Sequence, residues 1–185
     1  GTWPTSTAPV PRRRPGGRID PVVIEMELVG VRVEMPSSSP IALLREVGGS
    51  RRVLPIFIGA PEATAIAFAL EEVITPRPMT HDLFREVLDD LGVSLEKITV
   101  TELKEGVFHA ELELNGRDGV HTISSRPSDA IALAARTGSP IYATEDVLDE
   151  AGYLEEPEVE EAEEAEVVEQ FKDFLDSVNP EDFAS

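Results

Sequence analysis

The chain has 185 residues, of which 41% are hydrophobic and 5% aromatic, and it contains no cysteine. This hydrophobic fraction is enough for a packed core, and the length suits one domain with tails or two very small domains. The lack of cysteine excludes a disulfide framework, a thiolate zinc site and a cysteine nucleophile. We expect a cytoplasmic protein, because no apolar run approaches the roughly 20 residues of a membrane-spanning helix and residues 1–20 lack the apolar core of a secretory signal.

The formal net charge of −20 is unevenly distributed along the chain. Residues 1–20 carry four basic and one acidic side chains (net +3), residues 21–154 carry 11 and 22 (net −11), and residues 155–185 carry one and 13 (net −12). A protein that binds nucleic acid through its phosphates normally presents a basic surface. A nucleic-acid-binding role therefore requires a local arginine cluster, a bound cation, or both.

Ordered structure is predicted from about residue 21, after an arm over residues 1–20 whose Pro, Gly, Ser, Thr and Arg content is typical of disorder. Alternating apolar and polar residues predict strands, at residues 22–33, 41–47, 52–58, 96–103, 107–114, 120–124 and 141–143. Helical periodicity and helix-start signals predict helices, at residues 61–70, 81–91, 128–135 and 145–150.

Four local features refine these predictions. The alternation in the first strand changes phase at Gly30, which indicates a β-bulge. Pro55 places its strand at a sheet edge or at a bulge. In the first helix, Ala63–Leu70 is apolar nearly all round, so this helix is expected to be buried. Thr80 is predicted to be the N-cap of the helix over residues 81–91.

The order strand, hairpin, helix occurs twice. The helix-opening residues Pro61 and Pro127 are 66 residues apart, and so are Pro40 and Gly106, which precede the two hairpins. We interpret this spacing as an internal duplication in an α+β domain spanning residues 21–154, with an antiparallel-rich sheet packed against alanine-rich helices. A small duplicated sheet has edges to cover, so we also expect a homo-oligomer.

The C-terminal region has a different composition. Residues 155–166 form an acidic run, which is typical of a solvated linker. Apolar residues then share one helical face, so residues 167–185 are predicted to hold an amphipathic helix that ends at Asn179 and Pro180. Such a helix is expected to dock on its own domain or on a protein partner.

A first candidate site lies at the start of the helix over residues 81–91. In the structural interpretation, Thr80 caps the helix and Asp82 stabilises its positive end. In the functional interpretation, His81 is a proton-transfer group beside the Asp82 carboxylate, and Arg77 is a guanidinium that can bind a phosphate. The residues themselves leave both interpretations open.

A second candidate site lies at the start of the helix over residues 128–135. Pro127 and Asp129 suit a helix start, but Arg126 opposes the helix dipole and should pair with Asp129, another acid or a bound anion. A helix N-terminus with an adjacent arginine suits a phosphate, to which Ser128 can add a donor. Glu62 presents a carboxylate at the equivalent helix start of the first repeat.

A third, weaker candidate is one face of the second hairpin. If Leu114 lies opposite Val120, then His121 lies opposite Glu113, on the same face as the other polar side chains of the preceding strand. Two histidines and two glutamates then resemble a metal-ligand set, namely His109, Glu111, Glu113 and His121. A solvated hairpin face has the same pattern, so this alternative stays open.

Other nucleotide-binding and catalytic motifs are missing from the sequence. It has no Walker loop, no dinucleotide-binding glycine fingerprint after a strand, no nucleophile elbow and no zincin histidine pair. With so few aromatic residues, a base-stacking platform for single strands is also poorly supported.

Four stretches resemble the bifunctional nuclease family in order and spacing. They are EMELVGVRVEMP (25–36), LPIFIGAPEATAIAFAL (54–70), RPMTHDLF (77–84) and SSRPSDAIALAARTGSPIYA (124–143). The resemblance covers residues 22–154, and the stretch over residues 167–183 is similar to the tail of actinobacterial members. The plant members that give the family its name are credited with cleaving RNA and DNA. The recurring polar positions of the family correspond to Glu62, Arg77, Thr80, His81, Asp82, Arg126, Ser128 and Asp129.

The resemblance and the two helix-start motifs together predict a nuclease that hydrolyses phosphodiester bonds in RNA or DNA with Mg²⁺ or Mn²⁺. In this hypothesis the metal ligands are Glu62, Asp82 and Asp129, the catalytic residues are His81, Asp82 and Asp129, and the substrate-binding residues are Arg77, Thr80, Arg126 and Ser128. It requires the two motifs, 49 residues apart, to meet in one cleft. The alternative is a non-catalytic anion-binding or protein-interaction module with a regulatory role, which the acidic core favours.

Overall fold

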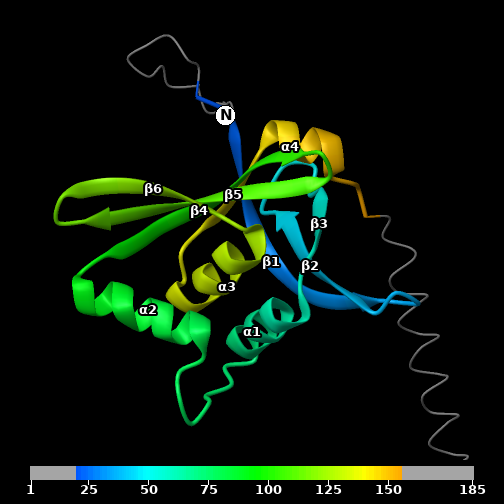
Figure 1. The fold of residues 1–185 in the computed structure, drawn as a ribbon. Coiled ribbons are helices and arrows are strands. Elements are labelled where there is room, and N and C mark those ends of the chain that lie inside the picture. The colour runs from blue at the N-terminus through cyan, green and yellow to red at the C-terminus, as the bar shows by residue number, and fades with distance from the viewer. Residues whose placement is uncertain (1–19, 156–185) are drawn as a thin grey trace, which may run out of the picture. The chain divides into compact units, whose positions relative to one another are not determined.

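The computed structural model describes residues 20–155, which form an α+β domain as predicted (Figure 1). The strands are β1 (Val23–Glu34), β2 (Ser39–Glu46), β3 (Val53–Phe57), β4 (Ser94–Lys104), β5 (Val107–Gly116), β6 (Gly119–Ser125) and β7 (Ile141–Thr144). The helices are α1 (Ala60–Leu70), α2 (Thr80–Leu91), α3 (Pro127–Thr137) and α4 (Glu145–Ala151).

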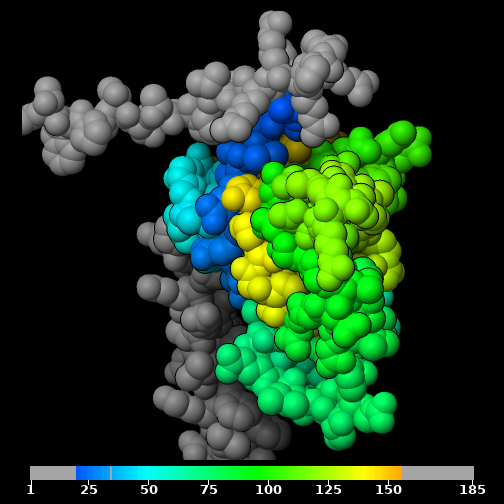
Figure 2. Space-filling model, turned by 90° about the vertical axis from the view of Figure 1, so that its left-hand side faces the viewer, coloured from blue at the N-terminus to red at the C-terminus, as the bar shows by residue number. Residues whose placement is uncertain are grey.

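The strands form one seven-stranded sheet in the order β3-β2-β1-β7-β4-β5-β6. Every neighbouring pair is antiparallel except β4 and β7, which run parallel. The short β7 therefore joins two three-stranded meanders, and Figure 2 shows this part of the chain (yellow) between β1 (blue) and the green strands. Each meander is followed in the chain by a helix, α1 or α3. This order matches the predicted repeat, while the duplication itself stays a prediction.

Two strand features agree with the sequence pattern. The pairing of β1 with β2 shifts register between Leu28 and Gly30, so the predicted bulge is confirmed. Pro55 belongs to β3, which is an edge strand of the sheet, and it lies opposite Leu43 of β2. Proline has no N–H to donate, and an edge strand leaves one side of its backbone without a partner strand.

The helices differ in burial more than their sequences predict. The core is centred on α3, whose residues 130–134 are all buried. By contrast, α1 buries Ala63, Ala65 and Ile66 but leaves Leu70 exposed, so the prediction that it is buried nearly all round is wrong. The reason is that α1 packs against β1, β2 and α3 on one side only.

Helix α2 also differs from expectation in two respects. Its N-cap is Met79 and not Thr80, because the Asp82 carboxylate accepts a hydrogen bond from the Met79 N–H at 3.0 Å. Only Leu88 of its apolar stripe is buried. The other members of the stripe are between 42% and 61% exposed, namely Leu83, Phe84, Val87 and Leu91.

The predicted arm over residues 1–20, the linker over residues 155–166 and the tail helix over residues 167–185 lie outside the described residues, apart from Asp20 and Glu155. Within residues 20–155, no helix is long and apolar enough to cross a membrane.

Candidate functional site

The two helix-start motifs meet where α2 crosses α3. The Nε2 atom of His81, in the first turn of α2, lies 2.9 Å from Oδ1 of Asp129, in the first turn of α3. The His81 side chain is largely buried. Packing of α2 on α3 thus joins the two motifs through this contact. They do not line one common cavity among the described residues, because Asp82 lines one cavity whereas Arg126 and Ser128 line another.

Arg126 connects this pair to the first repeat. Its Nε donates a hydrogen bond to Oδ2 of Asp129 at 2.7 Å, and its Nη2 donates one to Oε1 of Glu62 at 2.9 Å. The predicted pairing of Arg126 with acidic residues is thus observed, and Glu62 occupies the matching position at the start of α1. The hydrogen bonds that Arg126 donates to Asp129 and Glu62 raise the pKa of Arg126, so this guanidinium is permanently charged.

The protonation of Asp129 determines the tautomer of His81. Burial opposes ionisation of Asp129, but the hydrogen bonds from Arg126 and His81 outweigh it and lower its pKa. An ionised carboxylate only accepts hydrogen bonds, so Nε2 of His81 carries the proton and donates it to Asp129. The other ring nitrogen, Nδ1, forms no hydrogen bond with any residue that the structure describes, so it can accept a proton whenever the ring is neutral.

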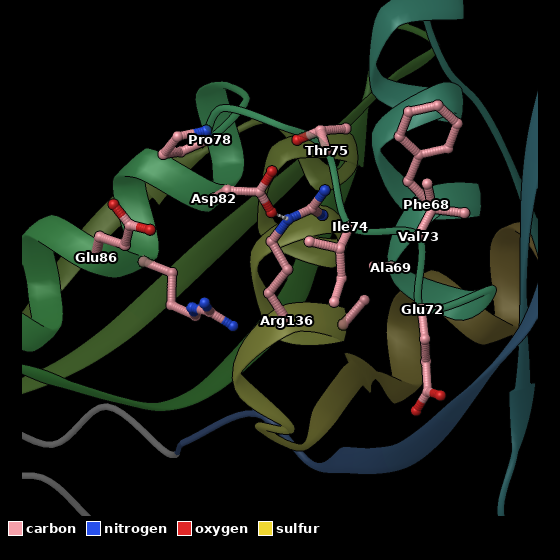
Figure 3. Close-up of a pocket in the computed structure, with 12 residues that line it drawn as sticks. Phe68, Ala69, Glu72, Val73, Ile74, Thr75, Pro78, Asp82, Glu86 and Arg136 are labelled. Atoms are coloured by element: carbon pink, nitrogen blue, oxygen red, sulfur yellow. Dashed lines mark hydrogen bonds and ion pairs between the residues drawn. The ribbon is translucent and has the colours of Figure 1, made fainter.

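Asp82 has a partner that the sequence hypothesis missed. Its Oδ1 accepts a hydrogen bond at 2.6 Å from Nε of Arg136, whose side chain is only 5% exposed (Figure 3). The hydrogen bond from Arg136 lowers the pKa of Asp82. Arg136 follows Asp129 by seven residues, or two helical turns, so both side chains lie on the face of α3 that contacts α2. This helical spacing was the signal in the sequence that could have identified it.

A cavity of about 620 Å³ lies beside the Asp82–Arg136 pair (Figure 3). Arg85 also lines it, and its buried Nε has no hydrogen-bond partner within residues 20–155. Two further lining residues are acidic, Glu72 and Glu86. Carboxylates therefore outnumber guanidiniums three to two in the lining, so this cavity is a poor site for an anion.

The remaining predicted residues have different surroundings. Ser128 is 6% exposed, and its hydroxyl makes no hydrogen bond to another described residue. Arg77 and Thr80 are exposed. No hydrogen bond or ion pair joins either side chain to another residue in the described part of the chain. The structure thus gathers Glu62, His81, Arg126 and Asp129, and it does not place Arg77 in that cluster.

Comparison with known proteins identifies the family. The model of the bifunctional nuclease domain matches residues 42–156, a stretch that contains all four clustered residues. The chain belongs to the bifunctional nuclease family.

An uncharacterized protein of Mycobacterium tuberculosis is 47% identical over 165 residues, which are 87% of this chain and 98% of that protein. Bifunctional nuclease 2 of Oryza sativa subsp. japonica is 29% identical over 116 residues, or 60% of this chain and 35% of the rice protein. Bifunctional nuclease 1 of Arabidopsis thaliana is 28% identical over 105 residues, or 55% of this chain and 32% of the plant protein. The chain thus spans about a third of these plant members.

The carboxylates predicted to bind a metal are not arranged as a ligand set. Glu62 and Asp129 both bind Arg126, whereas Asp82 binds Arg136. Within residues 20–155, no three His, Asp or Glu side chains form a cluster that could hold a cation. The role of Mg²⁺ or Mn²⁺ therefore stays a prediction from the sequence, and no catalytic step is derived through a metal.

The interpretation of the second hairpin face as a metal-ligand set is wrong. Gly116 pairs with Gly119 around a two-residue turn, so His121 lies opposite Leu114 and not opposite Glu113. A shift of one residue moves a side chain to the other face of a strand. His121 therefore lies on the opposite face from Glu113, whose carboxylate pairs with Lys97 at 3.3 Å.

Proposed function

We propose that the protein is a nuclease that hydrolyses phosphodiester bonds in RNA or DNA. The observation that carries this proposal is the 2.9 Å contact between His81 Nε2 and Asp129, beside the guanidinium of Arg126. Membership of the bifunctional nuclease family supports the same reaction class. The plant members named bifunctional nucleases are related to this chain over the region that contains the cluster.

His81 is the proton-transfer group in this proposal. With Nε2 held by Asp129, Nδ1 accepts a proton from the water that attacks the phosphorus atom. The P–O bond to the leaving oxygen then breaks, that oxygen takes up a proton from the solvent, and the imidazolium of His81 returns its proton to the solvent. Asp129 orients the ring and stabilises the imidazolium that forms, as a carboxylate does behind a catalytic histidine.

Arg126 compensates the charge that develops on the phosphoryl oxygens. A guanidinium has five N–H donors, and Arg126 uses two of them on Asp129 and Glu62, so three remain for a phosphate. Its side chain is 65% exposed, so a substrate can approach it. Residues 21–154 carry a net charge of −11, and Glu62 and Asp129 offset the charge of Arg126 itself. The site therefore offers a phosphate the three remaining N–H donors of Arg126 and not a net positive charge.

The experiment is a nuclease assay on labelled RNA and DNA with EDTA, Mg²⁺ or Mn²⁺. We expect His81→Gln to lower the cleavage rate by roughly 10²- to 10⁴-fold, and Asp129→Asn to lower it as well. His121→Gln is the matched control, because His121 is an exposed histidine on β6 outside the cluster. Equal cleavage by the wild type and His81→Gln would refute the assignment, and the comparison with EDTA measures the contribution of a divalent cation.

A protein-interaction role is the second candidate, and the exposed stripe of α2 favours it. Leu83, Phe84, Val87 and Leu91 are large apolar side chains on one helical face. Contiguous apolar surface of this kind commonly marks a protein–protein contact. We propose that a second copy of the chain covers this stripe, which agrees with the homo-oligomer expected from the sequence.

A further inference from the structure

A second cavity, of about 450 Å³, shares Arg126 with the proposed catalytic cluster. It lies where the ends of the two hairpins and the start of α3 come together. Its walls include Phe57 at the end of β3 and Phe108 at the start of β5. Arg126 and Ser128 line it from the beginning of α3.

The walls of this cleft combine three properties that suit one class of ligand. Phe57, with 64% of its surface exposed, offers an aromatic ring to solvent at the edge of the sheet. Among the described residues that line the cleft, Arg126 is the only charged one. Ser128 is 6% exposed, and its hydroxyl forms no hydrogen bond with another described residue, so this hydroxyl is available to a polar ligand atom in the cleft.

We propose that this cleft binds an unpaired base of single-stranded nucleic acid next to the phosphate held by Arg126. The inference rests on the proposed nuclease function and deepens it, because it specifies the form of the substrate. Aromatic side chains stack on any nucleobase, and a neighbouring cation holds the backbone. The sparse aromatic residues of the sequence gave little support for stacking, but the fold brings Phe57 and Phe108, 51 residues apart, into one cleft.

The position of Arg126 explains why the strand should be single. Arg126 lines the cleft and also binds Asp129, which holds His81. A phosphate on Arg126 would thus have the cleft on one side and the proton-transfer group on the other. A base can enter the cleft only if it is unstacked and unpaired, and a duplex resists this change by a few kcal/mol per base. The site therefore selects single strands, loops or ends.

The test measures binding separately from cleavage. Fluorescence anisotropy is recorded for the full chain carrying His81→Gln, so that a labelled oligonucleotide stays intact. Three probes share one sequence and length: the single strand, its duplex, and a strand whose bases are replaced by abasic sites. The test variant is Phe57→Leu, which keeps an apolar side chain at an exposed position. Tyr153→Leu is the matched control, because Tyr153 is an exposed aromatic residue that does not line the cleft.

We expect the single strand to bind more tightly than the duplex and the abasic strand. Phe57→Leu should weaken binding of the single strand by about tenfold, and Tyr153→Leu should leave it unchanged. Equal binding by the two variants, equal binding of normal and abasic strands, or no binding of any strand would overturn the inference. If the wild type cleaves nucleic acid but Phe57→Leu does not change binding, the base-binding cleft is refuted and the nuclease proposal stands. If binding depends on the bases but no cleavage occurs, the nuclease proposal is refuted and the base-binding cleft stands.

Discussion

Replacing Arg136 by methionine tests whether the ion pair with Asp82 holds α2 on α3. The Arg136 side chain is 5% exposed and donates to Asp82 at 2.6 Å and to the Ala132 carbonyl at 2.9 Å. Removing one partner of a buried ion pair typically costs about 3–5 kcal/mol. Because the Asp82 side chain is 30% exposed, water compensates part of its charge, and we expect the free energy of unfolding to fall by about 2 kcal/mol.

The measurement is urea denaturation followed by circular dichroism. Arg51→Met is the matched control, because Arg51 pairs with Glu27 at 3.1 Å where both side chains are about half exposed, and such pairs contribute roughly 0–1 kcal/mol. Since Arg136 lowers the pKa of Asp82, the pair stabilises the fold above the ordinary aspartate pKa of about 3.9. The difference between wild type and Arg136→Met should shrink as the pH falls through the lowered pKa. Equal stability at pH 7, or a difference that persists after Asp82 is protonated, would refute this reasoning.

Two further predictions concern stability and assembly. Arg52→Met should lower the free energy of unfolding by about 3–5 kcal/mol, measured by urea denaturation. The reason is that it leaves the buried carboxylate of Glu46 without its ion-pair partner and removes the ion pairs that Arg52, just before β3, makes with α4. A loss below that of Arg136→Met would contradict the prediction. Phe84→Ser should shift the chain toward the monomer, measured by light scattering, because it places a hydroxyl in the exposed apolar stripe of α2. A wild-type chain that is already monomeric at micromolar concentration would refute the oligomer proposal.

Much of the local structure was predictable from the sequence because it depends on neighbouring residues. Alternation located the strands, the phase change at Gly30 located the bulge, and Pro55 indicated an edge strand. Strand register was less predictable, because it depends on the length of the turn that closes a hairpin. The turn between β5 and β6 is shorter than expected, so His121 lies on the opposite face of the hairpin from the one predicted. The exposure of Leu70 likewise depended on which side of α1 the rest of the domain covers.

The sequence by itself determined the fold class, the family resemblance and the residue types at the two helix starts. Only the tertiary structure decided their geometry. The contact of His81 with Asp129, the pairing of Arg136 with Asp82 and the cleft between Phe57 and Phe108 all join residues more than 45 positions apart. Such contacts follow from how α2 crosses α3 and how β7 joins the two meanders. Local periodicity carries no information about either, because both are set by the packing of whole helices and strands on a shared core.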